Sequence, residues 1–535
     1  MIRKWCTIGI ILLFVGTCII PTLAQNGKQT SSKGNWLYVG GSGPGNYTKI
    51  QDAIYNASDG DTVFVYHGTY NESVGISKSI FVIGEDKNTT IIDGQFRFIA
   101  VVQFVADNIF FSGFSVIHSK FNLNGFGMSV TSHNIVTNNI IADNLGCYGG
   151  MLILGDYNQV NNNIVRNNTL DGISIRSSYT TISENDISDN LEGISVFSST
   201  NLIITKNHIH NNSEIGIYVR AWDKNEFSYN IIEDNGAAAF SFEQYASNNV
   251  IFGNIIKNNG DGLVIINVQY LSISNNSFYG DGIRFKGNAI NFWASHDITN
   301  NYINGKPIYY YKFEKDKVVP VNPEDAGQVI LAGCTSCLIE NVTISNVHFG
   351  IQLGYSSDNK IRRNHICNNN IGMYLFNSEK NVIETNIIAN NSDTGISLEY
   401  SNMNIIETNI IANNSDTGVT FGKCTTNVIT KNDFSNNNYA LWLYLSTENS
   451  IEKNNFINTI QKPIYFRVGP WPSTKNFFKN NYYSSHLSWI PYIIHGELQT
   501  KYTYYVSPGV YVPITIPWIN IDLHPAMIPY DIEGS

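Results

Sequence analysis

The chain has 535 residues, a net charge of −10 and a charged fraction of 14%. The acidic balance argues against DNA or RNA as a partner, because phosphate backbones are bound by strongly cationic surfaces. The length would ordinarily suggest several globular domains, but asparagine recurs at a fixed interval, and an internal repeat makes a domain count from length misleading.

Residues 1–24 have the parts of a secretory signal. Two cations near the start precede an apolar run over residues 8–20, and Thr22-Leu-Ala24 fits the small-residue cleavage pattern. We therefore expect a secreted, extracellular or cell-surface protein. Retention of this segment as a membrane anchor is the alternative. No later stretch is long and apolar enough to cross a bilayer, so we expect no transmembrane segment once the signal is removed.

Residues 25–94 are predicted to form an N-terminal cap and the first coils of a repeat structure. Thr48 to Gln51 reads as a capping box, and residues 50–57 have one apolar helical face. The sequence Asp-Gly-Asp at 59–61 ends this short helix. A stack of coils leaves unpaired strand edges at its ends, so we expect the helix to cover the first of them.

The repeat itself occupies residues 95–300 and 328–461. The pattern Asn-x-aliphatic-x-polar-Asn/Asp recurs about every 22 residues. Its aliphatic positions keep one phase: Val165, Ile187, Ile209, Ile232, Ile256 and Phe278, then Ile366, Ile388, Ile411, Phe434 and Phe456. A second column of small residues opens short alternating runs: Gly150, Gly172, Gly193, Gly216, Ala239, Gly262 and Gly282, then Gly350, Gly372, Gly395, Gly418 and Ala440.

These two columns predict the fold class. Short alternating runs separated by Gly and Asn are strands, and one coil cannot bury its apolar side chains unless other coils stack on it. We predict an all-β, single-stranded right-handed parallel β-helix, a solenoid of roughly fifteen coils of about 22 residues, with a short N-terminal capping helix and an aromatic C-terminal cap. Leucine-rich repeats need a leucine framework that is missing here, propeller blades are longer, and the phased aliphatics exclude disorder.

Two segments break the period. Residues 301–327 contain several tyrosines and a charged run, which predict a protruding loop or hairpin between the two repeat blocks. From Lys462 the period is lost, and Trp471, Trp489 and Trp518 appear. We expect residues 462–535 to form the C-terminal cap. An independent aromatic binding module is the alternative.

Several motifs resemble a known family. The segments Trp-Leu-Tyr-Val-Gly at 36–40, Ile-Gln-Asp-Ala-Ile at 50–54 and Gly-Asp-Thr-Val-Phe-Val at 60–65 look like the opening of pectin-lyase-like β-helix proteins. More narrowly, they resemble NosD-like surface proteins with parallel β-helix repeats, which are common in archaea, so we expect an archaeal source. Residues 304–330 and 480–532 are similar to a connecting insertion and to the end of that family. The resemblance is specific for fold and weak for activity.

The signatures of carbohydrate-active enzymes that share this fold are missing. The sequence has no Gly-His-Gly, no Asp-Pro-His-Glu and no Arg-x-Pro-x-x-Arg, and a glycosidase would need two carboxylates on one face. We interpret the scattered acids Asp186, Asp189, Glu233, Asp234 and Glu243 as solvated turn residues. Catalytic residues stay unknown and no cofactor is predicted. These observations favour a protein that is not an enzyme, with a polysaccharide lyase, epimerase or hydrolase as the alternative.

Copper is a further question, because NosD itself is associated with copper-site maturation of nitrous oxide reductase. A copper-site maturation accessory is therefore the third functional hypothesis. His208 and His210 flank an inward Ile209 and are expected to face outward, but no third ligand is evident, so they are only weak candidates and we predict no metal site. Cys334 and Cys337 have zinc-like spacing without a second such pair, and we interpret them as small turn or core thiols.

The alternation also predicts a strip of outward-facing residues on the glycine-initiated sheet. Aromatic faces stack on sugar rings, and arginine forks match carboxylates or sulfates. We therefore predict binding of a polysaccharide or cell-envelope glycan, or a scaffold role. The alternative is ordinary β-surface, since aromatics favour strands. The candidate ligand-binding residues are Arg176, Tyr218, Arg220, Arg284, Lys286, Tyr374, Phe376, Trp442 and Tyr444, and Phe197 and Glu243 share these positions.

Overall fold

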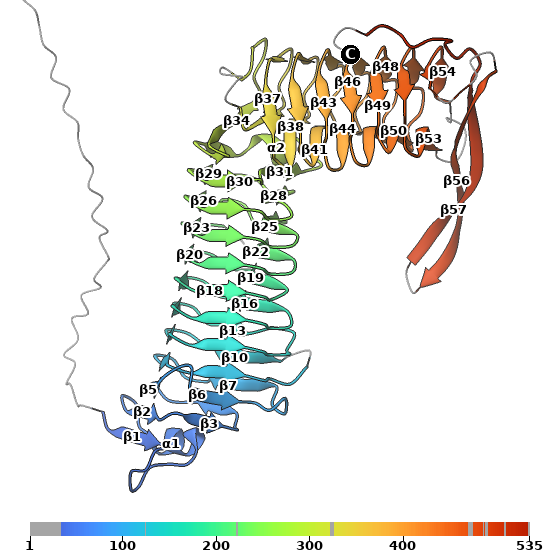
Figure 1. Ribbon diagram of the computed structural model, residues 1–535. Helices are drawn as coiled ribbons and strands as arrows, with labels where there is room; N and C mark the ends of the chain where they lie inside the picture. The colour runs from blue at the N-terminus through green and yellow to red at the C-terminus, as the bar shows by residue number, and fades with distance from the viewer. Residues whose placement is uncertain are drawn as a thin grey trace, which may run out of the picture.

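The computed structural model describes residues 34–122, 125–220, 223–320, 326–468, 475–484, 486, 490–507 and 510–532. The chain winds into an all-β, right-handed parallel β-solenoid of about 19 turns with only 2% helix (Figure 1). The predicted fold class is confirmed. The number of turns exceeds the expected fifteen. The predicted signal segment lies outside the described residues.

Three parallel sheets form the first block. The first sheet runs from β1 (Trp36–Val39) and β2 (Thr62–Val65) through every third strand to β32 (Asp297–Thr299). The second runs in the same way from β3 (Gly68–Tyr70) to β33 (Tyr302–Ile303). The third, inner sheet 1, runs from β4 (Val74–Ile76) to β31 (Ile283–Lys286). Each coil therefore gives one strand to every sheet.

The core is built from the phased aliphatic column. Ile187 pairs in register with Ile209, and Ile209 with Ile232, and all three side chains are fully buried. Each buried aliphatic side chain contributes roughly 1.5–3 kcal/mol. Stacking thus supplies the burial that a single coil lacks.

Buried asparagines form a ladder at the turn beside this column. The side-chain amide of Asn185 donates to the side-chain oxygen of Asn207 at 2.9 Å, and Asn207 repeats the contact with Asn230 at 3.0 Å. The backbone N–H of Asn185 also donates to that Asn207 oxygen, at 3.0 Å. An amide offers both donors and acceptors, so one residue type satisfies this turn in successive coils.

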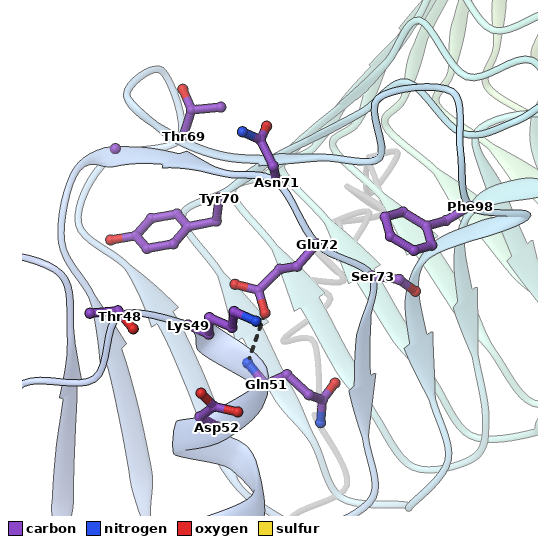
Figure 2. Close-up of a pocket in the computed structure, with 11 residues that line it drawn as sticks. Thr48, Lys49, Gln51, Asp52, Thr69, Tyr70, Asn71, Glu72, Ser73 and Phe98 are labelled. Atoms are coloured by element: carbon purple, nitrogen blue, oxygen red, sulfur yellow. Dashed lines mark hydrogen bonds between the residues drawn. The ribbon is translucent and has the colours of Figure 1, made fainter.

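The N-terminal helix α1 (Ile50–Asn56) covers the first coils with Ile50, Ala53 and Ile54 buried. The predicted capping box is wrong: Lys49 is the N-cap residue and makes no side-chain cap bond. The Glu72 carboxylate instead accepts the backbone N–H groups of Ile50 and Gln51, at 2.9 and 3.1 Å. Figure 2 shows the bond to Gln51. A carboxylate from the next coil satisfies the free amides of the helix start, so the helix needs no local cap.

The second block begins with a tight hairpin. Strand β33 pairs antiparallel with β34 (Lys306–Lys312), and β34 pairs in parallel with β35 (Gln328–Ala332). From β35, every third strand to β56 (Tyr492–Ser507) forms inner sheet 2. The other two sheets of this block run from β36 (Leu338–Glu340) to β54 (Phe477–Lys479) and from β37 (Thr343–Ser345) to β55 (Tyr482–Tyr483).

The two blocks meet at a sharp bend (Figure 1). Strand β31 ends inner sheet 1 and does not pair with β35. Helix α2 (Asn291–Ala294) fills the corner with Trp293, whose indole lies so close to Gly354 that a Cβ there would sit 2.1 Å from the ring. The bend turns inner sheet 1 and inner sheet 2 toward each other.

The C-terminal segment is a long antiparallel hairpin of β56 and β57 (Val510–Asp522), which projects from the end of block 2 (Figure 1). The Asp522 carboxylate ends the asparagine ladder by accepting the backbone and side-chain N–H groups of Asn481, at 3.0 and 3.1 Å. Trp518 lies in β57, whereas Trp471 and Trp489 lie outside the described residues. Among the described residues, no helix has the length and apolar character to cross a membrane.

Candidate functional site

The predicted strip lies on the outward faces of two sheets rather than one. Arg176 to Lys286 belong to inner sheet 1 and Tyr374 to Tyr444 to inner sheet 2. The expectation of one continuous glycine-initiated sheet is wrong, because the chain starts a new sheet at β34 after the bend. The two parts of the strip therefore face each other across the inner angle of the molecule (Figure 1).

Four strip residues come together in that angle. Arg284 and Lys286 from β31 line a cavity of about 360 Å³ with Tyr374 and Phe376 from β41 (Ile371–Phe376). Phe349 and Glu399 complete this wall. We call this cavity the elbow pocket. It exists only because residues about 90 positions apart are brought side by side by the bend.

Arg284 is held in place at the floor of the elbow pocket. Its guanidinium forms an ion pair with Asp261 at 3.0 Å and lies 4.8 Å from the centre of the Phe349 ring. The Asp261 side chain is only 6% exposed, and His348 lies 3.8 Å from it. The Asp261 carboxylate therefore balances the charge of Arg284 and fixes its position.

Lys286 and Tyr374 have shifted ionisation. Burial lowers the pKa of Lys286, and neighbouring Arg284 lowers it further. Burial raises the pKa of Tyr374, and so does Glu399, whose carboxylate accepts the Tyr374 hydroxyl at 3.2 Å. The rings of Tyr374 and Phe376 stack against Trp293, with centroids 6.4 and 6.1 Å apart. The pocket thus presents an ammonium group beside two oriented aromatic rings.

The remaining strip residues form separate clusters. Tyr218 donates its hydroxyl to Glu243 at 3.0 Å, and burial followed by Glu243 raises the pKa of Tyr218 to about 12. The Arg176 guanidinium lies 5.5 Å from the Phe197 ring. Arg220 is exposed on β22 (Ile215–Arg220) of inner sheet 1. Toward the end of inner sheet 2, Trp442 packs edge-on against Tyr465, and the Tyr444 ring lies 6.0 Å from the Arg467 guanidinium.

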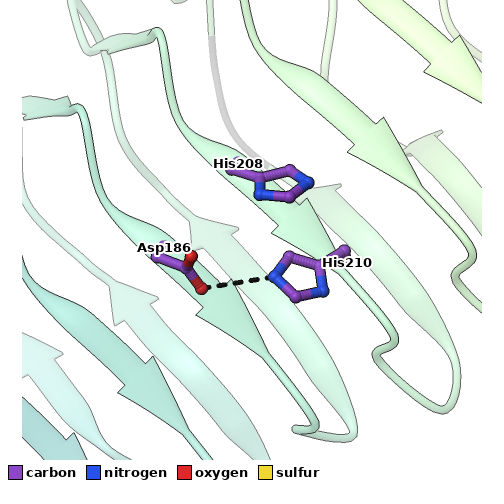
Figure 3. A group of neighbouring side chains, drawn as sticks. All are labelled: Asp186, His208 and His210. Atoms are coloured by element: carbon purple, nitrogen blue, oxygen red, sulfur yellow. Dashed lines mark hydrogen bonds and ion pairs between the residues drawn. The ribbon is translucent and has the colours of Figure 1, made fainter.

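A second group lies on another face, the second sheet of block 1. His208 and His210 flank buried Ile209 in β21 (His208–His210), as predicted. A third group that could bind a metal lies beside them, although none is evident from the sequence: Asp186 of β18 (Asp186–Ser188) is the register partner of His208. The ligand atoms of Asp186, His208 and His210 all lie within 4.8 Å of one another (Figure 3).

The interpretation of the scattered acids as solvated turn residues is also wrong for three of them. Asp186, Glu233 and Glu243 each lie in a strand and bond to a neighbouring coil. Asp186 contacts His210, Glu233 contacts His208 and Lys257, and Glu243 accepts from Tyr218. These positions flank inward residues, so their side chains face outward along the stack.

A further cavity of about 630 Å³ lies beside α1 (Figure 2). Two of its polar side chains, Glu72 and Gln51, are used by the fold. Glu72 holds the helix start, and the Gln51 amide both donates to the Gly75 carbonyl and accepts the Gly75 N–H. We therefore interpret this cavity as part of the N-terminal cap.

A family model described as periplasmic copper-binding protein (NosD) matches residues 54–201 and 304–487, which is more than half of the chain. The chain belongs to the NosD family. A second model, the right handed beta helix region, matches residues 149–306 of this NosD-family chain. None of the curated proteins compared with it matches.

Solved structures similar to this NosD-family chain are remote. Pectate lyase Pel9A is 16% identical, with 51% of this chain and 81% of that chain covered and a TM-score of 0.42. The A-module of the Azotobacter vinelandii mannuronan C-5 epimerase AlgE4 is 14% identical, with 75% and 93% covered and a TM-score of 0.25. The PL6 family alginate lyase AlyGC is 12% identical, with 83% and 88% covered and a TM-score of 0.38. At these values no activity is inferred from the likeness.

The sequence reasoning missed a row of acids in this NosD-family chain. Asp171 and Glu192 are register partners on inner sheet 1, and burial raises their pKa values to about 6 and about 7. Asp261 of the elbow pocket and Asp281 occupy the same place in their coils. The available signal was position, since each acid directly precedes a glycine of the small-residue column.

Three of the described cysteines of this NosD-family chain have structural roles. Cys334, Cys337 and Cys424 are buried, as expected for small thiols, and the five cysteines of the described residues are free. Burial raises the pKa of Cys334 to about 11 and that of Cys424 to about 12. Thiols with such values are poor nucleophiles and poor metal ligands at neutral pH.

Proposed function

We propose that this NosD-family chain is an extracytoplasmic β-helix that binds a cell-envelope polysaccharide in the elbow pocket. The observation that supports the proposal is the convergence of Arg284 and Lys286 with Tyr374 and Phe376 across the bend. The alternation in the sequence also predicts these four residues as outward-facing candidates for glycan binding. The bend adds the concavity that ligand sites have.

The chemistry of the pocket suits a sugar unit that carries hydroxyl groups and an anionic group. Tyr374 and Phe376 supply ring faces, and Glu399 supplies a carboxylate that accepts hydroxyl donors. The charge of Arg284 is balanced by Asp261, so Lys286 is the cation that would pair with a carboxylate or sulfate. A volume of about 360 Å³ is near the lower end of ligand pockets, which favours one or two sugar units of a longer chain.

Retention on a panel of immobilised acidic and neutral polysaccharides tests the proposal. We expect the purified protein to be retained on at least one acidic polymer, and an ultraviolet assay for unsaturated uronate products to stay blank. Formation of product would identify a lyase instead. Absence of retention on every polymer would reject glycan binding.

Copper binding is a second candidate function, because the family's description names copper. The observation that favours it is the group of Asp186, His208 and His210, since imidazole nitrogens and a carboxylate suit copper or zinc. These residues lie on the second sheet and not on the concave face. Metal binding and glycan binding are therefore independent hypotheses with separate tests.

A further inference from the structure

We propose that Asp186, His208 and His210 form a site for one divalent metal ion of the copper or zinc type, with Glu233 as a positioning residue. The inference assigns residues to the second candidate function and does not depend on glycan binding. It rests on the geometry of three strands that are neighbours in the second sheet, β18, β21 and β24 (Ile231–Glu233).

The solenoid places these side chains together. Ile187 and Ile209 are register partners that point into the core, so the residues on either side of each must point outward. Asp186 and His208 are themselves register partners, and neighbouring strands lie about 4.8 Å apart. A carboxylate of one coil and two imidazoles of the next therefore share one patch of surface, although 22 residues separate Asp186 from His208.

The donor set and spacing fit an ion of this type. Two imidazoles and one carboxylate are the ligands found in three-residue zinc sites, and imidazole also suits copper. Ligands of a tetrahedral ion lie roughly 3.3 Å from one another when each bond is about 2.0–2.1 Å long. The three ligand atoms already lie within 4.8 Å, and the His208 and His210 rings have centroids 4.2 Å apart. Rotation of partly exposed side chains can close the remaining gap without backbone movement.

Neighbouring groups support the imidazoles in the way that metal sites require. One carboxylate oxygen of Glu233 lies 2.9 Å from Nε2 of His208, and the other forms an ion pair with Lys257. The Asn211 amide lies 3.1 Å from Nδ1 of His210. A histidine that binds a metal usually has its other ring nitrogen held by such a partner, which fixes the tautomer and the ring plane.

The contact that the metal would replace is the one between His210 and Asp186, at 3.2 Å (Figure 3). The Asp186 side chain is 50% exposed and that of His208 is 40% exposed. An ion can therefore reach the group from solvent. The bound ion would link two adjacent coils, and metal binding is then coupled to the stability of the stack.

Titration of the metal-free protein with Cu²⁺, and separately with Zn²⁺, tests the proposal by calorimetry and, for copper, by electron paramagnetic resonance. We expect one ion per chain at this site, with two nitrogen ligands in the copper spectrum. The double variant His208→Gln/His210→Gln should bind at least about tenfold more weakly and lose the nitrogen splitting. Glu233→Gln should weaken binding while the two nitrogens remain in the spectrum.

His67→Gln is the matched control, because His67 pairs with Glu85 at 2.8 Å and, among the described residues, belongs to no group of three possible metal ligands. This variant should bind metal like the unaltered protein. An unchanged circular dichroism spectrum shows that the double variant still folds. Equal affinity and an equal copper spectrum in the double variant would overturn the site while leaving copper binding elsewhere. Failure of the unaltered protein to bind either ion would overturn both the proposed site and copper binding as a function of this chain.

Discussion

The side-chain amide of Gln328 pairs with the backbone of Ile283, donating to its carbonyl at 2.9 Å and accepting its N–H at 3.1 Å. Ile283 begins the last strand of inner sheet 1, and Gln328 begins β35, the first strand of inner sheet 2. One amide thus closes an open sheet edge and joins the two blocks. The elbow pocket is formed next to this pairing.

Gln328→Ala should destabilise the bend. The buried Ile283 N–H would lose its partner, which costs about 1–3 kcal/mol for a stranded group. The free energy of unfolding, measured by denaturant titration, should fall by that amount, and retention on the bound polysaccharide should weaken. Gln159→Ala is the control, because Gln159 is exposed on β14 (Gln159–Asn161), several coils before the bend. Equal stability of both variants would show that the Gln328 pairing does not hold the blocks together.

Asn207→Ala should destabilise block 1 by about 3 kcal/mol, because several buried groups would lose partners at once. The Asn207 amide donates to the carbonyl of Ile182 and to Asn230, and its oxygen accepts from Asn185. Thermal denaturation followed by circular dichroism measures the effect. Asn438→Ala, at a partly exposed turn position outside the ladder, should change the melting temperature little. A similar loss in both variants would contradict the role of the ladder.

The raised pKa of the Glu192 carboxyl predicts that the stability of the fold depends on pH. Burial raises its pKa in the folded chain to about 7 from an ordinary 4.5, so the folded state holds a proton that the unfolded state releases. The stabilisation is fully present below about pH 4.5 and is lost as pH rises through about 7. Asp171 acts in the same direction at about 6.

Glu192→Gln should therefore raise the melting temperature at pH 8 and flatten its dependence on pH between about 5 and 8. A glutamine oxygen can still accept the Ser195 hydroxyl that Glu192 now accepts. Scanning calorimetry at several pH values measures both quantities. Parallel curves for the variant and the unaltered protein would contradict the assignment to Glu192.

Lys286→Gln should reduce polysaccharide retention at least about tenfold, because a charge-assisted contact to an anionic group is lost. Lys206→Gln is the control and should leave retention unchanged, because Lys206 is an exposed lysine that directly follows β20 (Ile203–Thr205) of the first sheet. A triple variant of Tyr218, Arg220 and Trp442 separates the pocket from the rest of the strip. Loss of retention in the triple variant alone would move the binding site out of the elbow.

The sequence predicted the fold well because its physical signal is local and repeated. Ile187, Ile209 and Ile232 share a phase, and the phase alone requires them to stack. The outward positions of Arg284 and Tyr374 followed from the same alternation. The capping role of Glu72 could not be predicted in this way, because the contact joins residues 21 and 22 positions apart without a repeated pattern.

The bend could not be predicted from the repeat pattern for a similar reason. It depends on single contacts of Gln328, Gln352 and Trp293, none of which recurs in other coils. The site residues could thus be predicted as outward-facing, but their proximity could not. The group of Asp186, His208 and His210 could not be predicted from the two histidines alone, because Asp186 belongs to the preceding coil and meets His208 only through the strand register.

A crystal structure with the shortest oligosaccharide that the protein retains tests the central claim most directly. We predict a sugar ring in the elbow pocket, against Tyr374 or Phe376, with an anionic group within hydrogen-bond distance of Lys286. A sugar bound on another face, with the elbow free of ligand, would contradict the account.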